Sequence, residues 1–203
     1  MRRFIARAVN VIRHPEGEWP VISREQRSLG DLFWFYLTPL ALTGPLAHGG
    51  RVLLGGDGAA RGSADANETL LVALQGVFGG YLASLLSVAA LAVVAWQLAP
   101  LFAGRRSLGE ACRVVIYAST PLWLAGGILI APLDRFPLLA VVILVAAMHS
   151  AFLFYLGMHH VLKVPRGDAA ECTAIVLMAG ILLSTVAGYY ASAAGLFTSC
   201  SAC

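Results

Sequence analysis

The chain has 203 residues, of which 59% are hydrophobic and 12% are charged. Soluble domains carry about 25% charged residues, so this composition excludes an ordinary soluble protein and predicts an integral membrane protein. The net charge of +3 at pH 7, with no long basic run, excludes nucleic acid as an expected partner. The abundance of Arg, Ala, Gly and Leu is typical of a bacterial protein from a GC-rich genome.

The first 14 residues predict an amphipathic helix that lies in the membrane surface. Its apolar face is formed by Phe4, Ile5, Ala8, Val11 and Ile12, and its polar face by Arg3, Arg7, Asn10 and His14. Pro15 is expected to end this helix, and Pro20 to hold the following chain extended. Such a head is interpreted as a membrane anchor, with a cytoplasmic docking surface for a partner as the alternative.

Four residues are predicted to anchor the chain at the level of the lipid headgroups. They are Arg3 and Arg7 in the head, Trp19 after it, and Trp34 at the start of the first apolar run. Tryptophan is enriched at membrane interfaces, and basic side chains face anionic headgroups there.

Five charge-free runs follow the head, and each is long enough for a transmembrane helix, which needs about 20 apolar residues. The expected spans cover about residues 32–50, 69–103, 114–133, 136–162 and 172–196. We expect the second run to form one long helix, because no Pro or charge divides it; two short helices that turn at Gly79-Gly80 are the alternative. The predicted fold is an all-α membrane protein, with a head of residues 1–30 and a five-helix transmembrane domain of residues 31–203.

Basic residues predict the orientation, because Lys and Arg are retained on the cytoplasmic side. The head and the second and fourth connections hold eleven: Arg2, Arg3, Arg7, Arg13, Arg24, Arg27, Arg105, Arg106, Arg113, Lys163 and Arg166. The first and third connections hold three: Arg51, Arg61 and Arg135. We therefore expect a cytoplasmic N-terminus and an external C-terminus.

Small residues recur every four positions in two of the expected spans. The second span carries Gly76, Gly80 and Ser84, and the fifth carries Gly180, Ser184, Gly188 and Ser192. Such rows let helix backbones approach closely. They predict packing within the bundle, with a homo-oligomer contact as the alternative.

His149 lies in the middle of the fourth span, where an ionisable residue is a candidate functional site. Tyr117, Thr120 and Pro121 of the third span are expected near the same depth, and Tyr155 further along the fourth. Pro121 frees the carbonyl of Tyr117, which favours a kink. The cluster is interpreted as a neutral histidine bonded between helices, with a proton- or substrate-handling site as the alternative.

Metal and thiol chemistry have few candidate residues. His149 and His160 share nearly one helical face, but two histidines do not complete a metal site, and no cofactor is expected. Cys200 and Cys203 end the chain as C-x-x-C on the external side. A disulfide or a dispensable tail is favoured there, with a metal pair or a redox pair as alternatives.

The order of short motifs along residues 5–195 resembles the Yip domain family, whose eukaryotic members interact with Ypt/Rab GTPases. The resemblance rests on Pro15, Trp19 and Ile22, on YASTP from Tyr117 to Pro121, on Tyr155 and Gly157, and on Ala169 and Ala170. It implies a five-span membrane protein of the bacterial inner-membrane branch, without catalytic residues. GTPase binding is not implied, because the acidic N-terminal region of the eukaryotic members is absent from this sequence.

These observations predict a non-enzymatic scaffold or interaction protein of the bacterial inner membrane. Its expected partners are the lipid bilayer and either another protein or further copies of itself. An accessory subunit of a larger complex is one form of this function. The alternatives are a small transporter or channel that uses the His149 cluster for a metal or protons, and a lipid-organising protein.

Overall fold

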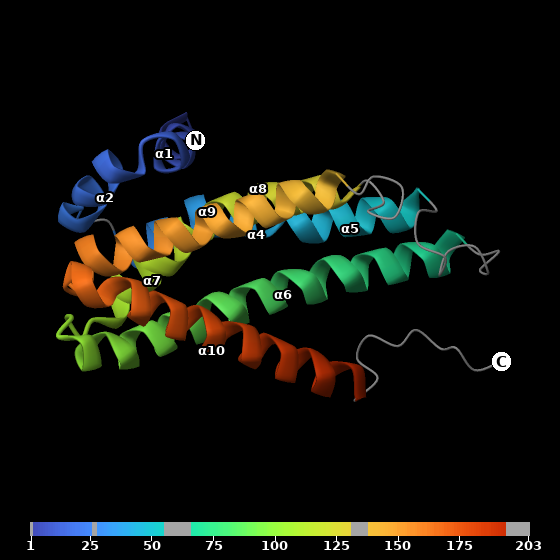
Figure 1. The fold of residues 1–203 in the computed structure, drawn as a ribbon. Helices are drawn as coiled ribbons and strands as arrows, with labels where there is room; N and C mark the ends of the chain where they lie inside the picture. Colours follow the sequence, from blue (N-terminus) through green and yellow to red (C-terminus); the bar gives the residue numbers. More distant parts are fainter. Residues whose placement is uncertain (1, 26–27, 55–65, 131–137, 194–203) are drawn as a thin grey trace.

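The computed structural model describes residues 2–25, 28–54, 66–130 and 138–193, and every regular element in these stretches is helical. Figure 1 shows a head of two short helices lying across one end of a bundle of long rods. The head consists of α1 (Arg2–Arg13) and α2 (Pro15–Arg24).

The rods correspond in order to the five predicted apolar runs. The first comprises α3 (Leu29–Leu32), the π-helix η1 (Phe33–Leu37), α4 (Thr38–Ala41) and α5 (Thr43–Leu53). The second comprises α6 (Ala66–Leu98) and the 3₁₀ turn η3 (Ala99–Phe102), and the third comprises α7 (Leu108–Ala118), α8 (Thr120–Gly126) and η4 (Gly127–Ile130). The fourth is α9 (Leu138–His160) and the fifth is α10 (Arg166–Ala193).

Successive rods run in opposite directions, so the head lies at one end of the bundle and α10 leads the chain toward the other end (Figure 1). The long run is one continuous helix, α6, which confirms that expectation and spans about 50 Å at 1.5 Å per residue. Two stretches, Ala66–Phe102 and Leu138–His160, are long and apolar enough to cross a membrane by length and composition. The five-span count and the orientation of the termini stay predictions.

Proline explains why the third rod is divided. Pro121 has no N–H to donate to the carbonyl of Tyr117, so α7 ends at Ala118 and α8 begins after Ser119. The first and third rods then cross at two glycines, Gly44 and Gly126. A Cβ added at Gly126 would lie 3.3 Å from the Cα of Gly44, so only small residues permit this backbone approach.

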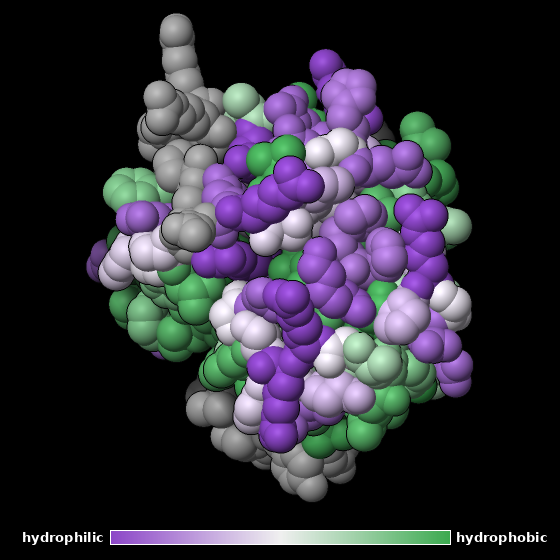
Figure 2. Space-filling model, turned by 90° about the vertical axis from the view of Figure 1, so that its left-hand side faces the viewer, coloured by the Kyte–Doolittle hydropathy of each residue, from purple (hydrophilic) through white to green (hydrophobic). Residues whose placement is uncertain are grey.

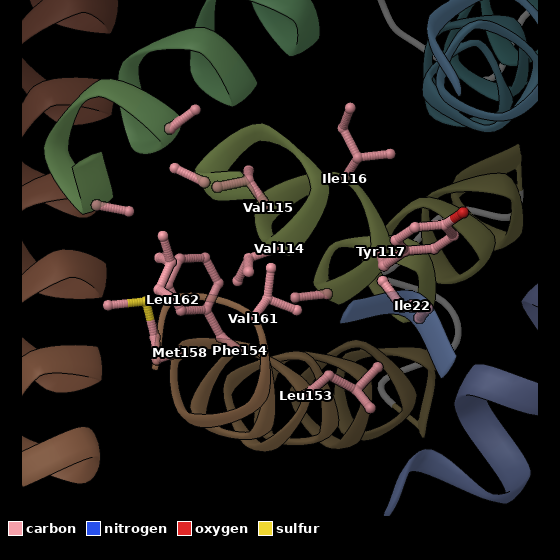
Figure 3. Close-up of a cluster of buried hydrophobic side chains, with 14 of the residues drawn as sticks. Ile22, Val114, Val115, Ile116, Tyr117, Leu153, Phe154, Met158, Val161 and Leu162 are labelled. Atoms are coloured by element: carbon pink, nitrogen blue, oxygen red, sulfur yellow. The ribbon is translucent and has the colours of Figure 1, made fainter. Parts of the chain in front are cut away.

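The core is concentrated near the head end of the bundle. Figure 3 shows side chains of α7 and α9 packed into one cluster, to which α2 contributes Ile22. Tyr117, Leu153 and Met158 are among its fully buried members. Further along the rods, large apolar side chains are exposed, for example Phe78 on α6 and Leu144 on α9. The buried core therefore lies where the head meets the rods.

The head differs from its prediction in two respects. Pro20 lies inside helix α2 rather than in extended chain, so that expectation is wrong. As the sixth residue of α2, Pro20 removes the one intrahelical hydrogen bond that its N–H would make to the carbonyl of Glu16, and the rest of this ten-residue helix is kept. The apolar face of α1 also turns inward, because Ala8 and Val11 are buried in the protein core.

Candidate functional site

The junction between head and bundle is centred on Trp19. Its side chain has no exposed surface, and α2 lays it against α9 at Gly157. A Cβ added at Gly157 would lie 2.8 Å from Cη2 of Trp19 and 2.7 Å from Cγ1 of Val114. Gly157 therefore creates the space that the indole fills. The predicted headgroup anchor at Trp19 is wrong, because a buried indole docks the head instead.

An ion-pair network holds the two head helices together. The guanidinium of Arg7 on α1 pairs with the carboxylate of Glu18 on α2, and its Nη2 donates to Oε1 of Glu25 over 2.9 Å. The amide of Asn10 also donates to Glu18, over 3.0 Å. Arg113 of α7 donates to the backbone carbonyl of Glu25 over 2.9 Å. The network thus links α1, the end of α2 and α7.

Arg7 is therefore directed at protein carboxylates and not at lipid, which corrects its predicted anchor role. Its side chain is only 14% exposed. Burial alone would lower the pKa of Arg7, but the hydrogen bond to Glu18 and the charge of Glu25 outweigh burial and raise the pKa. Trp34 is 66% exposed and stays a candidate anchor. The side chain of Arg3 lies outside the described residues.

A buried pair of tyrosines lies beside the break in the third rod. The rings of Tyr36 and Tyr117 meet edge to face with centroids 4.8 Å apart. The hydroxyl of Thr120 donates to the carbonyl of Tyr117 over 2.7 Å, which satisfies the acceptor that Pro121 leaves free. Because that bond uses the only hydroxyl hydrogen of Thr120, the Tyr36 hydroxyl must donate to Thr120 Oγ1, 2.8 Å away.

The predicted polar cluster is assembled only in part. Tyr117, Thr120 and Pro121 lie together beside Tyr36. His149 Nε2 is buried without a hydrogen-bond partner, and its ring lies 6.3 Å from that of Phe152. Tyr155 packs half-buried against the apolar core. Six residues separate His149 from Tyr155, which places them about 120° apart around the helix, so they face different neighbours.

Sequence reasoning missed Tyr36. The run Phe33–Leu37 is rich in aromatic residues, of which only Trp34 is among the predicted headgroup anchors, and η1 buries Tyr36 and Leu37 and exposes Trp34 and Phe35. A π-turn changes the angle between successive side chains, so helical periodicity does not locate the buried face. The only available signal was a tyrosine near a predicted polar cluster.

Two substitutions should distinguish the roles of the hydroxyls in this pair. Tyr36→Phe removes one donor and leaves the Thr120–Tyr117 bond, so it should cost about 1 kcal/mol of unfolding free energy. Thr120→Val removes both bonds and leaves the Tyr36 hydroxyl and a backbone carbonyl unsatisfied, so it should cost about 2–3 kcal/mol. Thermal unfolding in detergent measures both, and Thr120→Ser is the control that should restore most of the loss. Equal costs for the two variants would contradict this bonding order.

The small-residue rows lie at contacts within the bundle wherever their side chains are described. A Cβ at Gly76 would lie 3.0 Å from His48 of α5, and one at Gly80 would lie 3.2 Å from Pro45. One at Gly180 would overlap the side chain of Leu91 on α6. Ser84 donates to the carbonyl of Gly80 within its own helix. The side chains of Ser184 and Ser192, and the surroundings of Gly188, lie outside the described residues.

The metal and thiol candidates do not form a shared site in the described part of the chain. His149 and His160 are 11 residues apart on α9, or about 16 Å along its axis, which is too far for one metal ion. No group of three or more His, Cys, Asp or Glu residues gathers among the residues described. Cys112 and Cys172 are free thiols, and burial raises the pKa of Cys112. Cys200 and Cys203 lie outside the described residues.

The motifs that are separate along the chain meet at this junction. Trp19 contacts Gly157, and Ile22, Tyr117 and Ala169 are buried in the same core. The family model described as the Yip1 domain matches residues 9–188, a range that begins in α1 and ends in α10. No curated protein and no solved structure matched the chain. With the family model covering most of its length, the chain belongs to the Yip1 domain family.

Proposed function

We propose that this Yip1 family membrane protein is a non-enzymatic scaffold that binds a protein partner, or further copies of itself, through its docked head. The proposal rests on one observation: the fully buried side chain of Trp19 packs against Gly157. Trp19, Ile22 and Gly157, which are among the residues that resemble the family motifs, pack the head against the rods. An accessory subunit of a larger complex is one form of this role.

A docked head is suited to binding because its outer surface is held in one arrangement. Val9 and Val21 are 40% and 51% exposed on the outside of the head, and Arg13, Glu16 and Arg24 are exposed near them. Figure 2 shows this end of the molecule, where hydrophilic residues cover much of the centre and hydrophobic ones lie mostly toward the edges. A surface held rigid before binding loses less conformational entropy when a partner docks.

We further propose that the protein is a multi-pass protein of the bacterial inner membrane with the head in the cytoplasm. The basic residues described at the head end are Arg7, Arg13, Arg24, Arg105, Arg106, Arg113, Lys163 and Arg166, whereas Arg51 lies at the opposite end of the first rod. Excess Lys and Arg mark the cytoplasmic side. This distribution supports five spans with the C-terminus outside.

Native mass spectrometry of the protein, extracted from its own membrane in mild detergent, tests the scaffold proposal. We expect a partner chain or a defined homo-oligomer in stoichiometric amount. The assembly should be lost in Val21→Glu, which charges the outer head surface, and kept in Leu108→Glu, which charges an exposed apolar residue at the same end but outside the head. A lone monomer, or equal losses in both variants, would overturn the proposal.

A small transporter or channel is the second candidate, favoured by one observation. His149 Nε2 is buried in the middle of α9 without a hydrogen-bond partner, so the ring has capacity for a proton or a ligand. Proteoliposomes that contain the wild-type protein should then conduct protons or a divalent metal, and His149→Ala should abolish that flux. Flux equal to that of empty liposomes would remove this candidate.

A further inference from the structure

Two short connections meet at the head end of the bundle and are bonded into one unit. Residues 103–107 join the second rod to the third, and residues 161–165 join α9 to α10. The backbone N–H of Arg105 donates to the carbonyl of Leu162 over 2.6 Å. The contact depends on Gly104, because a Cβ there would lie 2.7 Å from Val164 Cγ2 and 3.0 Å from the carbonyl oxygen of Leu162.

Four basic side chains lie on this unit or directly after it: Arg105, Arg106, Lys163 and Arg166, the first residue of α10. We call them the two-loop basic patch, and all four are exposed. Lys163 has a φ of 59°, a left-handed conformation typical of a tight turn. Arg166 donates to Nε2 of His159 over 3.3 Å, which holds its side chain against the end of α9.

The charge of the patch is not neutralised within the described part of the chain. The exposed carboxylates on adjoining α10 are Asp168 and Glu171, and α7 carries the half-buried Glu110. None of these carboxylates forms an ion pair with a cation of the patch, since both described ion pairs belong to Arg7. The patch therefore presents a net positive surface to whatever lies beside it.

The patch lies at the border between the apolar rods and the polar end of the molecule. The guanidinium of Arg106 stacks on Trp96, 4.8 Å from its ring centroid, and donates to Gln97 at the end of α6. Leu101, in the turn that follows, is 76% exposed. A Trp ring at the end of an apolar helix favours the headgroup level of a bilayer, so these cations are placed at the depth of lipid phosphates.

We propose that the two-loop basic patch binds the phosphate of an anionic phospholipid headgroup. A guanidinium fork matches two phosphate oxygens, and a lysine ammonium adds a compact charge. Basic pockets between membrane helices on the cytoplasmic side are suited to such headgroups. A lipid fits better than a soluble anion because the exposed Leu101 and the half-buried Trp96 lie where the acyl chains of a bound lipid would enter the bilayer.

Lipid titration of the purified full-length protein tests this site. Dioleoyl phosphatidylglycerol, or dioleoyl phosphatidylcholine as the neutral comparison, is added to the protein in mild detergent, and bound lipids are counted by native mass spectrometry. One variant is Arg105→Gln with Arg106→Gln, and a second is Lys163→Gln with Arg166→Gln. The matched control, Arg13→Gln with Arg24→Gln, removes the same charge from the exposed head. Elution from a sizing column and thermal unfolding verify that each variant is folded.

The wild-type protein should prefer phosphatidylglycerol, and each patch variant should lose about 30-fold in affinity for it, because each basic residue near an anionic surface contributes about fivefold. The control should change this affinity less than about twofold, within measurement scatter. The proposal is overturned if the patch variants bind phosphatidylglycerol like the wild type, or if the control loses as much. Displacement of the lipid by equimolar glycerol phosphate would also overturn it, because the site would then be one for soluble anions. The two patch variants lie on separate loops, so a folding failure in one leaves the other to decide.

Discussion

Gly157→Leu should detach the head from the bundle and lower the stability of the protein by about 3 kcal/mol, the upper part of the range for overpacked cores. The added side chain would enter space that Trp19 and Val114 occupy, since even a Cβ would lie 2.8 Å and 2.7 Å from them. An indole ring cannot bend, and Val114 is itself fully buried, so neither neighbour has room to retreat. The steric conflict is relieved most easily by movement of α2.

The loss of stability should increase with the size of the side chain at position 157, and it should be specific to this position. Gly157→Ala should destabilise less than the leucine variant, because alanine adds one carbon and favours a helix by about 1 kcal/mol over glycine. Gly167→Ala is the matched control: it lies in α10, and a Cβ there would meet nothing within 4 Å. It should be neutral or slightly stabilising. Thermal unfolding in detergent measures stability, and limited trypsin digestion at Arg13 and Arg24 reports release of the head.

A double substitution separates docking from a general disturbance of α9. Trp19→Ala alone should cost about 3–5 kcal/mol, because it leaves a large cavity at the junction. Once the indole is absent, a leucine at position 157 has part of the space it needs, so the two losses should sum to more than the loss of the double variant. Strict additivity, or a trypsin pattern unchanged in Gly157→Leu, would show that Trp19 and Gly157 do not depend on each other.

The sequence predicted the long elements well because their signal is strong. Charge-free runs and Pro121 located the rods and the break in the third, and most of the uninterrupted run over residues 69–103 lies in the single helix α6, which ends at Leu98. These features depend on local properties of the chain. The resemblance to the Yip domain family was also found in the sequence itself, and the family model confirmed it.

The position of the head was harder to predict, because the residues that it packs against are distant in sequence. Trp19 before a membrane span suits a headgroup anchor, and nothing local shows that Gly157, far along the chain, leaves a space for it. Arg7 was assigned to lipid for the same reason, although Glu18 and Glu25 lie within reach once α1 and α2 fold against each other. His149 was placed by depth alone, and depth does not determine which way a side chain faces.

Arg7→Met should loosen the head by removing the cation that two carboxylates share. Glu18 and Glu25 would then remain close together without their partner, each with a side chain no more than 17% exposed. Breaking a fully buried ion pair costs about 3–5 kcal/mol, and this network retains some contact with water, so we expect a loss of about 2 kcal/mol. Methionine keeps most of the aliphatic contact, so the change is chiefly one of charge.

Arg13→Met is the matched control, because Arg13 lies on the same helix and is exposed. It should change stability by less than about 0.5 kcal/mol. Arg7→Lys should fall between the two, because an ammonium keeps the charge but cannot bond two carboxylates with a planar fork. Unfolding in detergent measures the stability of all three variants, and trypsin cleavage after Arg24, a site that all three keep, reports release of the head.

The Arg7 network should contribute no pH dependence of its own through the guanidinium. The pKa of Arg7 is raised because Glu18 and Glu25 outweigh the opposing effect of burial. A group whose folded pKa is raised stabilises the fold below its unfolded pKa and loses that contribution only as the pH rises through the folded value. For arginine both pKa values lie far above neutral pH, so the stability difference between wild type and Arg7→Met should not show a basic-side decline between about pH 7 and 9. A decline there would contradict this assignment, and equal losses in Arg7→Met and Arg13→Met would mean that the ion pairs of Arg7 contribute little to the docking of the head.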